Sequence, residues 1–325
     1  MISGMASYGL TIPLGGVPLT DHQAVYREAA ALGYKELWSA EVSGTDAFTP
    51  LALGAVWQPE MNLGTAIVPA FTRGPALVAM QAATIANLAP GRFTLGIGAS
   101  SNVIVQQWNA IDFDLPFKKT RDVVRFVKDA MTGEKVSKEY DTFRIDGFKL
   151  ANPPETPPKI LVAALREQML RMAGREADGA IINWLSAGDA SRVVPEVGAG
   201  KTVVARIFVA PSEDVKTVRS MARYAIAAYL NVPVYAEFHK WLGRGNQLSG
   251  MWEAWAAGDR KAALSEIPDE VVDDLVVHGS PAECREKIEA FFAAGVDIAA
   301  VAIMPFGISE LDGMRALAPN RGSSI

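Results

Sequence analysis

Four small residues, Gly98-Ala99-Ser100-Ser101, directly follow the apolar run 93–97. Glycine allows backbone N–H groups to approach a ligand closely, and serine hydroxyls supply further donors and acceptors. This loop could therefore bind the polar edge of a small molecule. The alternative is an ordinary tight turn in which a serine or Asn102 caps the next segment, and the spacing alone favours that turn.

A second candidate is the stretch from Leu165 to Met169, which opens a predicted helix at 166–174. The first turn of a helix has unpaired N–H groups and a partial positive charge, so it could hold a phosphate group. Arg166 could pair with that phosphate, because a guanidinium matches phosphate geometry. The alternative is a solvated arginine at a helix start.

Three side chains are candidates for proton transfer. Glu41 follows the predicted strand 34–39, Asp46 starts the predicted helix 46–57, and His278 precedes a predicted helix start. Each also has a structural explanation: a surface carboxylate for Glu41, an N-cap for Asp46 and simple packing for His278. The N-cap is the favoured interpretation of Asp46. His239 is a further histidine with the same two alternatives.

Cysteine and histidine are scarce. The chain has one cysteine, Cys284, and three histidines that lie far apart, so we expect neither an intrachain disulfide nor a metal site. Cys284 falls inside a predicted helix without an activating neighbour, which favours a structural role. Trp108 and Trp184 follow predicted strands and could wall a pocket, although core packing is the commoner role of such aromatics.

All of these candidates depend on the elements before them. The segment 62–102 predicts a strand, a helix from Pro75 that stops at Pro90-Gly91, and a second strand. The pattern of helix, glycine and apolar strand then recurs along the chain. Strands are predicted near 6–12, 34–39, 62–68, 93–98, 159–164, 179–184, 202–209 and 297–304. Helices are predicted near 20–32, 46–57, 75–89, 117–132, 166–174, 188–197, 212–230 and 281–294.

Eight strands alternating with helices predict an α/β fold, a (β/α)₈ TIM barrel in a single domain over 1–325. The strands are almost continuously apolar, as expected for a parallel sheet covered on both faces. Two insertions are predicted, at 136–158 after the fourth helix and at 231–268 between the seventh and eighth strands. They would be lids or substrate walls, or alternatively dimer contacts or extra core. Capping boxes are predicted at 20–23 and 280–283.

The bulk composition excludes several function classes. A net charge of −5 gives no basic surface for nucleic acid or for an anionic membrane. No apolar run approaches the roughly 20 residues of a membrane helix, and the N-terminus lacks the positive region of a signal peptide. With half of its residues hydrophobic, the chain can bury a large core. A cytoplasmic protein is expected.

At the level of ordered motifs, the chain resembles the luciferase-like monooxygenase superfamily, in particular its deazaflavin (coenzyme F420)-dependent oxidoreductases. The matching pieces span most of the chain in order and at similar spacing. They are residues 32–39 with Glu41, 46–50, 63–68, 95–100, 159–165 with Met169, 173–174, 177–180 with 183–185, and 279–281. The set is less specific for the cofactor, because relatives in the same barrel use FMN.

The resemblance implies where the cofactor would lie. The ring would rest at the carboxyl ends of the strands, on a bulge in the third strand with a non-prolyl cis peptide, which by motif position is Ala66–Ile67. The implied cofactor-binding residues are Glu41, Thr65, Ala66, Ile67, Gly98, Ala99, Ser100, Ser101, Ala163, Ala164, Leu165, Arg166, Gln168, Met169 and Asn183.

The chain also departs from the family pattern. Arg166 stands where relatives tend to have a small residue. Val42 and Ser101 stand where the sugar-phosphate enzymes of the superfamily have a catalytic His and Glu, and the alcohol dehydrogenases share that His. We therefore expect that the chain does not oxidise glucose 6-phosphate or simple alcohols by that mechanism.

The resemblance implies F420-dependent hydride transfer between the deazaflavin and a small organic substrate, in a homodimer. Three alternatives stay open: an FMN-dependent monooxygenase, a methylenetetrahydromethanopterin reductase-like enzyme, and a flavin-binding barrel without catalytic activity.

Overall fold

Eight parallel strands close into a barrel in the computed structural model, which describes residues 6–322. Around the barrel the order is β1-β2-β3-β5-β8-β9-β10-β12, and β12 pairs with β1 to close it. The strands are β1 (Ser7–Ile12), β2 (Glu36–Ser39), β3 (Asn62–Thr65), β5 (Phe93–Gly98), β8 (Lys159–Ala163), β9 (Gly179–Asn183), β10 (Thr202–Ala210) and β12 (Ile298–Ile303). The predicted TIM barrel is confirmed.

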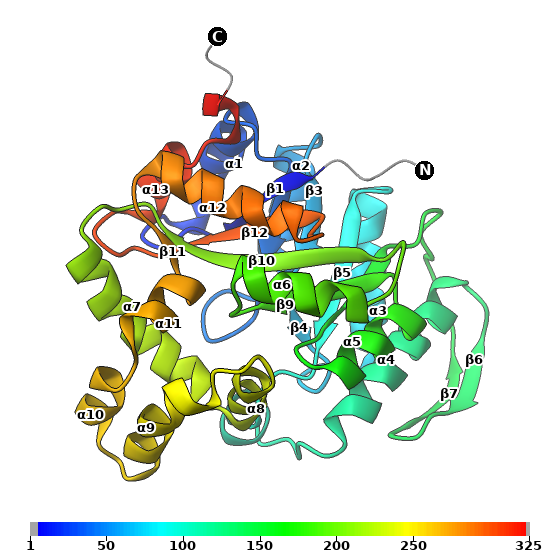
Figure 1. Ribbon diagram of the computed structural model, residues 1–325. Coiled ribbons are helices and arrows are strands. Elements are labelled where there is room, and N and C mark those ends of the chain that lie inside the picture. The colour runs from blue at the N-terminus through cyan, green and yellow to red at the C-terminus, as the bar shows by residue number, and fades with distance from the viewer. Residues whose placement is uncertain (1–5, 323–325) are drawn as a thin grey trace.

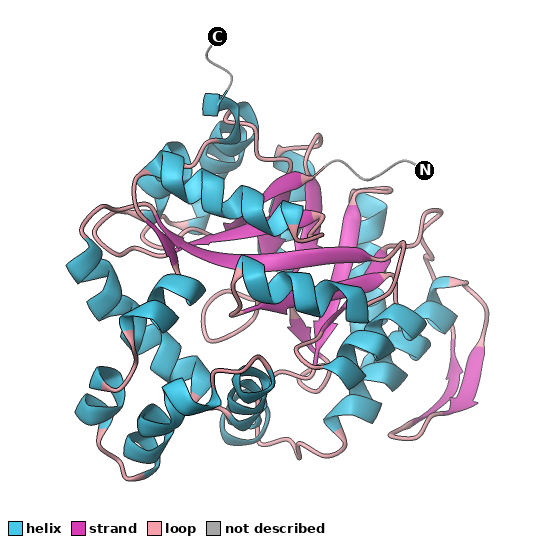
Figure 2. Ribbon diagram, in the orientation of Figure 1, coloured by secondary structure: helices cyan, strands magenta, loops and turns pink. Residues whose placement is uncertain are grey.

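Helices surround this barrel, as Figures 1 and 2 show. The helices that alternate with the strands are α1 (His22–Ala31), α2 (Phe48–Trp57), α3 (Pro75–Leu88), α4 (Pro116–Met131), α5 (Glu167–Glu176), α6 (Ala187–Val193), α7 (Val215–Leu230) and α12 (Pro281–Ala293). Each falls within a few residues of its predicted range. Short α13 (Glu310–Ala316) follows the last strand and was not predicted.

The first predicted insertion is a β-hairpin, formed by β6 (Val136–Glu139) and β7 (Arg144–Phe148). The second contains α8 (Pro233–Trp241), α9 (Gly245–Ala256) and α10 (Arg260–Ser265), and it is followed by α11 (Asp269–Leu275) and β11 (Val277–His278). In the view of Figure 1, α7 to α10 gather at the lower left, whereas the hairpin projects at the right. The two insertions therefore cover different parts of the barrel.

One predicted strand is interrupted. The range 62–68 divides into β3 and the two-residue β4 (Val68–Pro69), and both pair with β5. Between them the Ala66–Ile67 peptide bond is cis, at the position that the resemblance implied. The backbone of β3 thus leaves the regular ladder at the carboxyl end of the strand.

One of the two predicted capping boxes is wrong. At Ser280 the side chain accepts a hydrogen bond from the Glu283 amide and the reciprocal bond is present, as predicted. At 20–23 no side chain caps the helix. His22 is instead buried, and its ring bonds the amide of Leu14 and the carbonyl of Pro18. A contact with the preceding loop replaces the local box.

The core has three parts. Apolar side chains between the strands and the outer helices form the largest cluster, and a second lies under α7 to α11. A third fills the inside of the barrel with Trp38, Ala66, Leu161, Ile181, Val204 and Ala300. Because the barrel is packed in this way, a ligand can bind only at a rim and not within the barrel.

Candidate active site

The rim lies at the carboxyl ends of the strands. It is formed by side chains on the inner face of each strand, which alternate with side chains that face the outer helices. Val204 lies inside the barrel, so the strand period of two places Arg206 on the same inner face, nearer the rim. Ile67, Ala99, Ala163 and Asn183 lie at the ends of the other strands, and like Arg206 they are partly exposed to solvent. This rim is the surface that a ligand could reach.

Thr65 joins the broken strand to its neighbour. Its buried hydroxyl donates to the Gly96 carbonyl at 2.9 Å and accepts from the Gly96 amide at 2.8 Å. These bonds replace the ladder where β3 leaves the sheet. The predicted site residue Thr65 therefore uses its side chain to hold the rim, while its neighbours Ala66 and Ile67 present the surface.

Glycine creates a narrow space on this side of the rim. A Cβ at Gly98 would lie 2.9 Å from the Ala163 Cβ and 3.1 Å from Ile67 side-chain atoms. Only hydrogen fits there without displacing a neighbour. Ile67, Gly98 and Ala163 consequently form one close-packed apolar surface, and all three were predicted as cofactor-binding residues.

The loop after β5 combines the two interpretations of its sequence. The Ser101 hydroxyl accepts the Ile104 amide at 3.3 Å and so bonds the first turn of the short π-helix Val103–Trp108, as a tight turn would, while Asn102 holds the N-cap position. Ser100 has φ of 67°, a left-handed conformation that is uncommon for a residue with a side chain. Such conformations concentrate at functional sites.

Glu41 is not an isolated carboxylate. Both of its oxygens accept hydrogen bonds from the guanidinium of Arg73, and one also accepts the Ala47 amide at 3.1 Å. Both side chains are largely buried, at 13% and 14% exposure. The pair is neutral overall and fixes the loop after β2. Sequence reasoning missed Arg73, although an arginine just before the Gly74-Pro75 helix start was the available signal.

Asp46 and His278 have structural partners. Asp46 accepts the amides of Phe48 and Thr49 at 2.9 and 3.0 Å, so it caps the start of α2, the favoured interpretation. Burial alone would raise the pKa of Asp46, but the hydrogen bonds from Thr49 and Phe48 lower it below its ordinary value. The ring of His278 bonds Asp273 at 2.9 Å through Nε2.

The start of α5 has free backbone donors. Arg166 occupies the N-cap position in an extended conformation, and no side chain caps the first turn. The backbone amides of Glu167 and Gln168, in the first turn of α5, thus have no side-chain acceptor. The Arg166 side chain is exposed, and Met169 packs against the core. This terminus can hold an anion.

Asn183, at the end of β9, contacts the second insertion. Its amide and the hydroxyl of Tyr235 on α8 are hydrogen bonded, at 3.2 and 3.4 Å for the two possible donors. Burial raises the pKa of Tyr235 to about 12, so its hydroxyl stays protonated at neutral pH. The contact places α8 over this part of the rim.

The two tryptophans differ. Trp184 is 1% exposed and stacks on Phe208 with ring centroids 4.0 Å apart, in the core beneath the insertion. Its φ of 52° is a second left-handed conformation at the rim. Trp108 is 54% exposed and lies on the π-helix after β5.

Arg206 is a rim residue that the sequence reasoning did not single out. It pairs with Asn183 in the register of β10 with β9, and its guanidinium lies over the Phe208 ring, with the Cζ atom 5.1 Å from the centroid. Its Nε is buried and lacks a hydrogen-bond partner within residues 6–322. The signal was present in the sequence, as one arginine within the apolar run 202–210.

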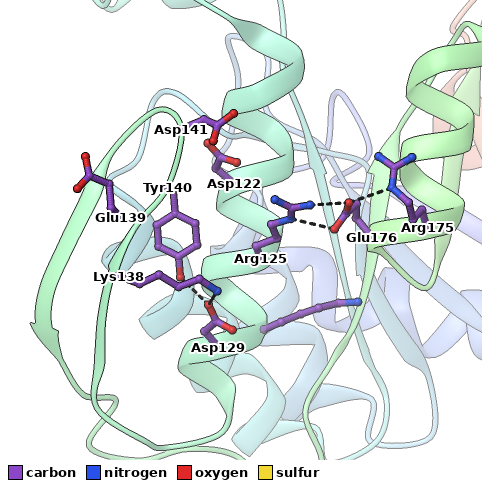
Figure 3. A pocket seen from close by; sticks show the side chains of 10 residues that line it. Asp122, Arg125, Asp129, Lys138, Glu139, Tyr140, Asp141, Arg175 and Glu176 are labelled. Carbon is purple, nitrogen blue, oxygen red and sulfur yellow. Dashed lines mark hydrogen bonds and ion pairs between the residues drawn. The ribbon is translucent and has the colours of Figure 1, made fainter.

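A surface pocket of about 450 Å³ lies elsewhere, on the outer wall between α4, α5 and the hairpin (Figure 3). Several of its charged side chains are paired with each other: Arg125 bonds Glu176 at 2.8 and 2.9 Å, and Asp129 accepts from Lys138 and from the Tyr140 hydroxyl. The bond from Arg125 is the main cause that lowers the pKa of Glu176 to about 2. The network fixes the hairpin to the barrel wall, and we assign it no ligand.

Burial raises the pKa of the Cys284 thiol to about 12, as expected for an inert structural cysteine. Within residues 6–322, no cluster of three His, Cys, Asp or Glu side chains could hold a metal ion. None of the helices described there has the length and hydropathy needed to span a bilayer.

Comparisons with known proteins agree with the barrel. The sequence model of the luciferase-like monooxygenase family matches residues 4–298. A Mycobacterium tuberculosis protein named as a coenzyme F420-dependent oxidoreductase is 24% identical over 88% of this chain and 92% of its own length.

Solved structures of the same fold include enzymes of both cofactor types. A coenzyme F420-dependent tetrahydromethanopterin reductase from Methanopyrus kandleri superposes with a TM-score of 0.79, at 20% identity over 97% of this chain and 98% of that one. The oxygenating constituent of 3,6-diketocamphane monooxygenase from Pseudomonas putida, in complex with FMN, gives a TM-score of 0.68 at 17% identity, over 98% and 99%.

Proposed function

We propose that this chain, which belongs to the luciferase-like monooxygenase family, is an F420-dependent oxidoreductase that transfers a hydride between the deazaflavin and an organic substrate. That it is an oxidoreductase follows from its relatives. The choice of F420 is our proposal. Relatives named for F420 support that choice, and the observation that carries the position of the ring is the close-packed apolar surface of Ile67, Gly98 and Ala163, on which a flat ring could lie.

The rim offers groups that could bind both the ring and the phosphate of such a cofactor. Ile67 and Gly98 would support the ring from one side, and the backbone of 99–101 would bond its polar edge. The uncapped first turn of α5 would hold the phosphate, with the exposed Arg166 beside it. When bound, the deazaflavin supplies a carbon that donates or accepts a hydride.

The protein's own contribution is orientation and exclusion of water. The Glu41–Arg73 pair and the Thr65–Gly96 bonds fix the loops around the ring, and α8 covers the other side through Tyr235. Glu41, Asp46 and His278, the predicted proton-transfer candidates, are each bonded to another protein group. The proton that accompanies the hydride therefore has no assigned donor among them.

The proposal is tested by fluorescence titration with F420 and with FMN, followed by assays of reduced F420 against a panel of acceptors. We expect tighter binding of F420 and its oxidation by at least one acceptor. Preference for FMN would favour the monooxygenase alternative. Reduction of methylenetetrahydromethanopterin would place the chain with the reductases, and F420 binding without turnover would favour a barrel without catalytic activity.

A matched pair of variants localises the binding. Gly98→Leu should abolish F420 binding, because its Cβ would lie 2.9 Å from the Ala163 Cβ and its side chain must displace Ile67 or Ala163, which form the proposed ring surface. Gly245→Leu, on α9, meets only ordinary contacts at 3.7 Å or more and should bind F420 as the parent does. Equal affinities of the two variants would show that the ring binds elsewhere.

We also propose a homodimer. Apolar side chains are exposed on neighbouring helices α2 and α3, namely Val56, Leu77, Met80 and Leu88, at 44% to 65% exposure. Burial of this surface by a second copy would stabilise the pair. Light scattering after size-exclusion chromatography should give twice the 34.8 kDa chain mass, and Val56→Glu with Met80→Glu should give the monomer. A monomeric parent would contradict the proposal.

A further inference from the structure

Arg206 is a cation inside the rim of the barrel whose guanidinium has no hydrogen-bond or ion-pair partner among residues 6–322. We propose that Arg206 binds the carboxylate of an organic acid substrate, an inference that rests on the proposed function and specifies its substrate class.

The orientation follows from the strand register. Arg206 opposes Asn183 on β9 and Ala300 on β12, and Ala300 belongs to the packed interior of the barrel. Val204 lies two residues before Arg206 on the same face. The guanidinium therefore extends from the barrel interior toward the rim, on the side covered by α8, and not toward the outer helices.

The surroundings leave the charge uncompensated. The Arg206 side chain forms no hydrogen bond or ion pair within the described residues 6–322, although its Nε is buried. Burial raises the pKa of Glu310 on α13. The charge of Arg206 is near enough to oppose that shift in part. The Glu310 carboxylate is bonded to the Gly15 amide at 2.7 Å instead. A partly buried charge without a partner is costly unless a ligand pairs with it.

The chemistry favours a carboxylate. The planar guanidinium offers parallel N–H donors that match the two oxygens of a carboxylate, and the Phe208 ring supports its face. Arg73, also at the rim, is already paired with Glu41. A monoanion suits a single free arginine better than a phosphate dianion does. Tyr235, whose hydroxyl is bonded to Asn183 beside Arg206, could bond the rest of an acid whose body is apolar.

The same chemistry could come from the carboxylates or phosphate of the cofactor itself. The experiment must therefore separate binding of the substrate from binding of the cofactor. The probes are two acids and their neutral isosteres, benzoate with benzamide and hexanoate with hexanamide. Calorimetric titrations are made with the F420-saturated protein and repeated without F420.

We expect the parent protein to bind at least one acid about tenfold more tightly than its amide, as loss of a charged hydrogen bond implies. Arg206→Gln should remove this preference, and Arg206→Lys should keep part of it, because the charge stays but the planar geometry is lost. Arg144→Gln, at a position 69% exposed on β7, is the control and should behave as the parent. F420 affinity should stay within about twofold in all variants.

Two results would overturn the assignment. The first is that the parent protein prefers neither acid over its amide. The second is a tenfold loss of F420 affinity in Arg206→Gln, which would show that Arg206 binds the cofactor. Failure of the proposed function can be distinguished from failure of the Arg206 assignment. In that case F420 does not bind the parent, whereas the preference for acids, measured without cofactor, still decides the role of Arg206. Thermal melts of each variant establish that it is folded.

Discussion

The two sides of the rim differ in how far their polar groups are bonded within the protein. On the β3–β5 side, formed by Glu41, residues 65–67, Arg73 and residues 96–101, the two charges pair with each other and the hydroxyls of Thr65 and Ser101 bond the backbone. On the β9–β10 side, formed by Asn183, Trp184, Arg206, Phe208 and Tyr235, two buried nitrogen atoms, Nε1 of Trp184 and Nε of Arg206, have no partner within residues 6–322. The first side is bonded as a scaffold, whereas the second holds the free guanidinium that we propose binds a ligand.

This difference matches the two proposed roles, with the cofactor ring on the β3–β5 side and the substrate on the β9–β10 side. A flat, uncharged ring needs a rigid apolar support, which paired polar groups and glycines provide. A substrate that enters and leaves needs groups that are free to bond it. Unpaired groups cost stability, and proteins keep them where binding needs them.

The largest expected effect is on the β3–β5 side. A Cβ at Gly96 would lie 2.0 Å from the Thr65 carbonyl oxygen, a backbone atom that cannot move without breaking the Thr65–Gly96 bonds. Gly96→Ala should therefore lower the free energy of unfolding by about 3 kcal/mol or more, measured by urea denaturation. Gly245→Ala is the control, and equal stability of the two would show that this side is not tightly packed.

The two arginines test the comparison directly. Arg73→Met leaves the largely buried Glu41 carboxylate unpaired and should lower the free energy of unfolding by about 2–3 kcal/mol. Arg206→Met removes a charge that has no partner and should leave that free energy unchanged or raise it by up to about 1 kcal/mol. Equal destabilisation in urea denaturation would remove the distinction between the two sides.

Acidification should destabilise the packing of α8, on which His239 is buried. Burial, together with the charge of Arg244, lowers the pKa of His239 to about 4, against 6.5 in an unfolded chain, although nearby Asp189 raises it in part. Between these values only the unfolded state binds the proton, so the contribution to stability is retained above pH 6.5 and falls as pH decreases toward 4.

At pH 5 this loss is about 2 kcal/mol relative to pH 7.5. Denaturation of the parent at both pH values, compared with His239→Leu, isolates the term. The variant should lose about 2 kcal/mol less than the parent on acidification. An identical loss would mean that His239 titrates normally.

The smallest effect is expected at the contact between α8 and the rim. Tyr235→Phe removes the hydrogen bond to Asn183 but keeps the ring, so the free energy of unfolding should fall by about 1 kcal/mol. A change in substrate KM without a change in F420 affinity would place α8 over the substrate. A change confined to F420 affinity would extend the cofactor site to this side.

Much of the fold could be predicted because its signals are local. The apolar runs and the glycines that end the helices gave all eight barrel strands within a few residues, and the Ser280 capping box needs only four consecutive residues. The box at 20–23 failed because buried His22 bonds Leu14 and Pro18, a contact that no four-residue pattern contains.

The sequence by itself determined the barrel, its rim and the small residues at the strand ends, because strand period, turn chemistry and the size of glycine act over a few residues. Only the tertiary structure decided which polar groups of the rim are free. Glu41 looked available until the fold brought Arg73 to it, and Arg206 looked like one residue of an apolar strand until closure of the barrel placed it beside Asn183 without a carboxylate. Pairing depends on distances between strands, and those distances exist only once the barrel is closed.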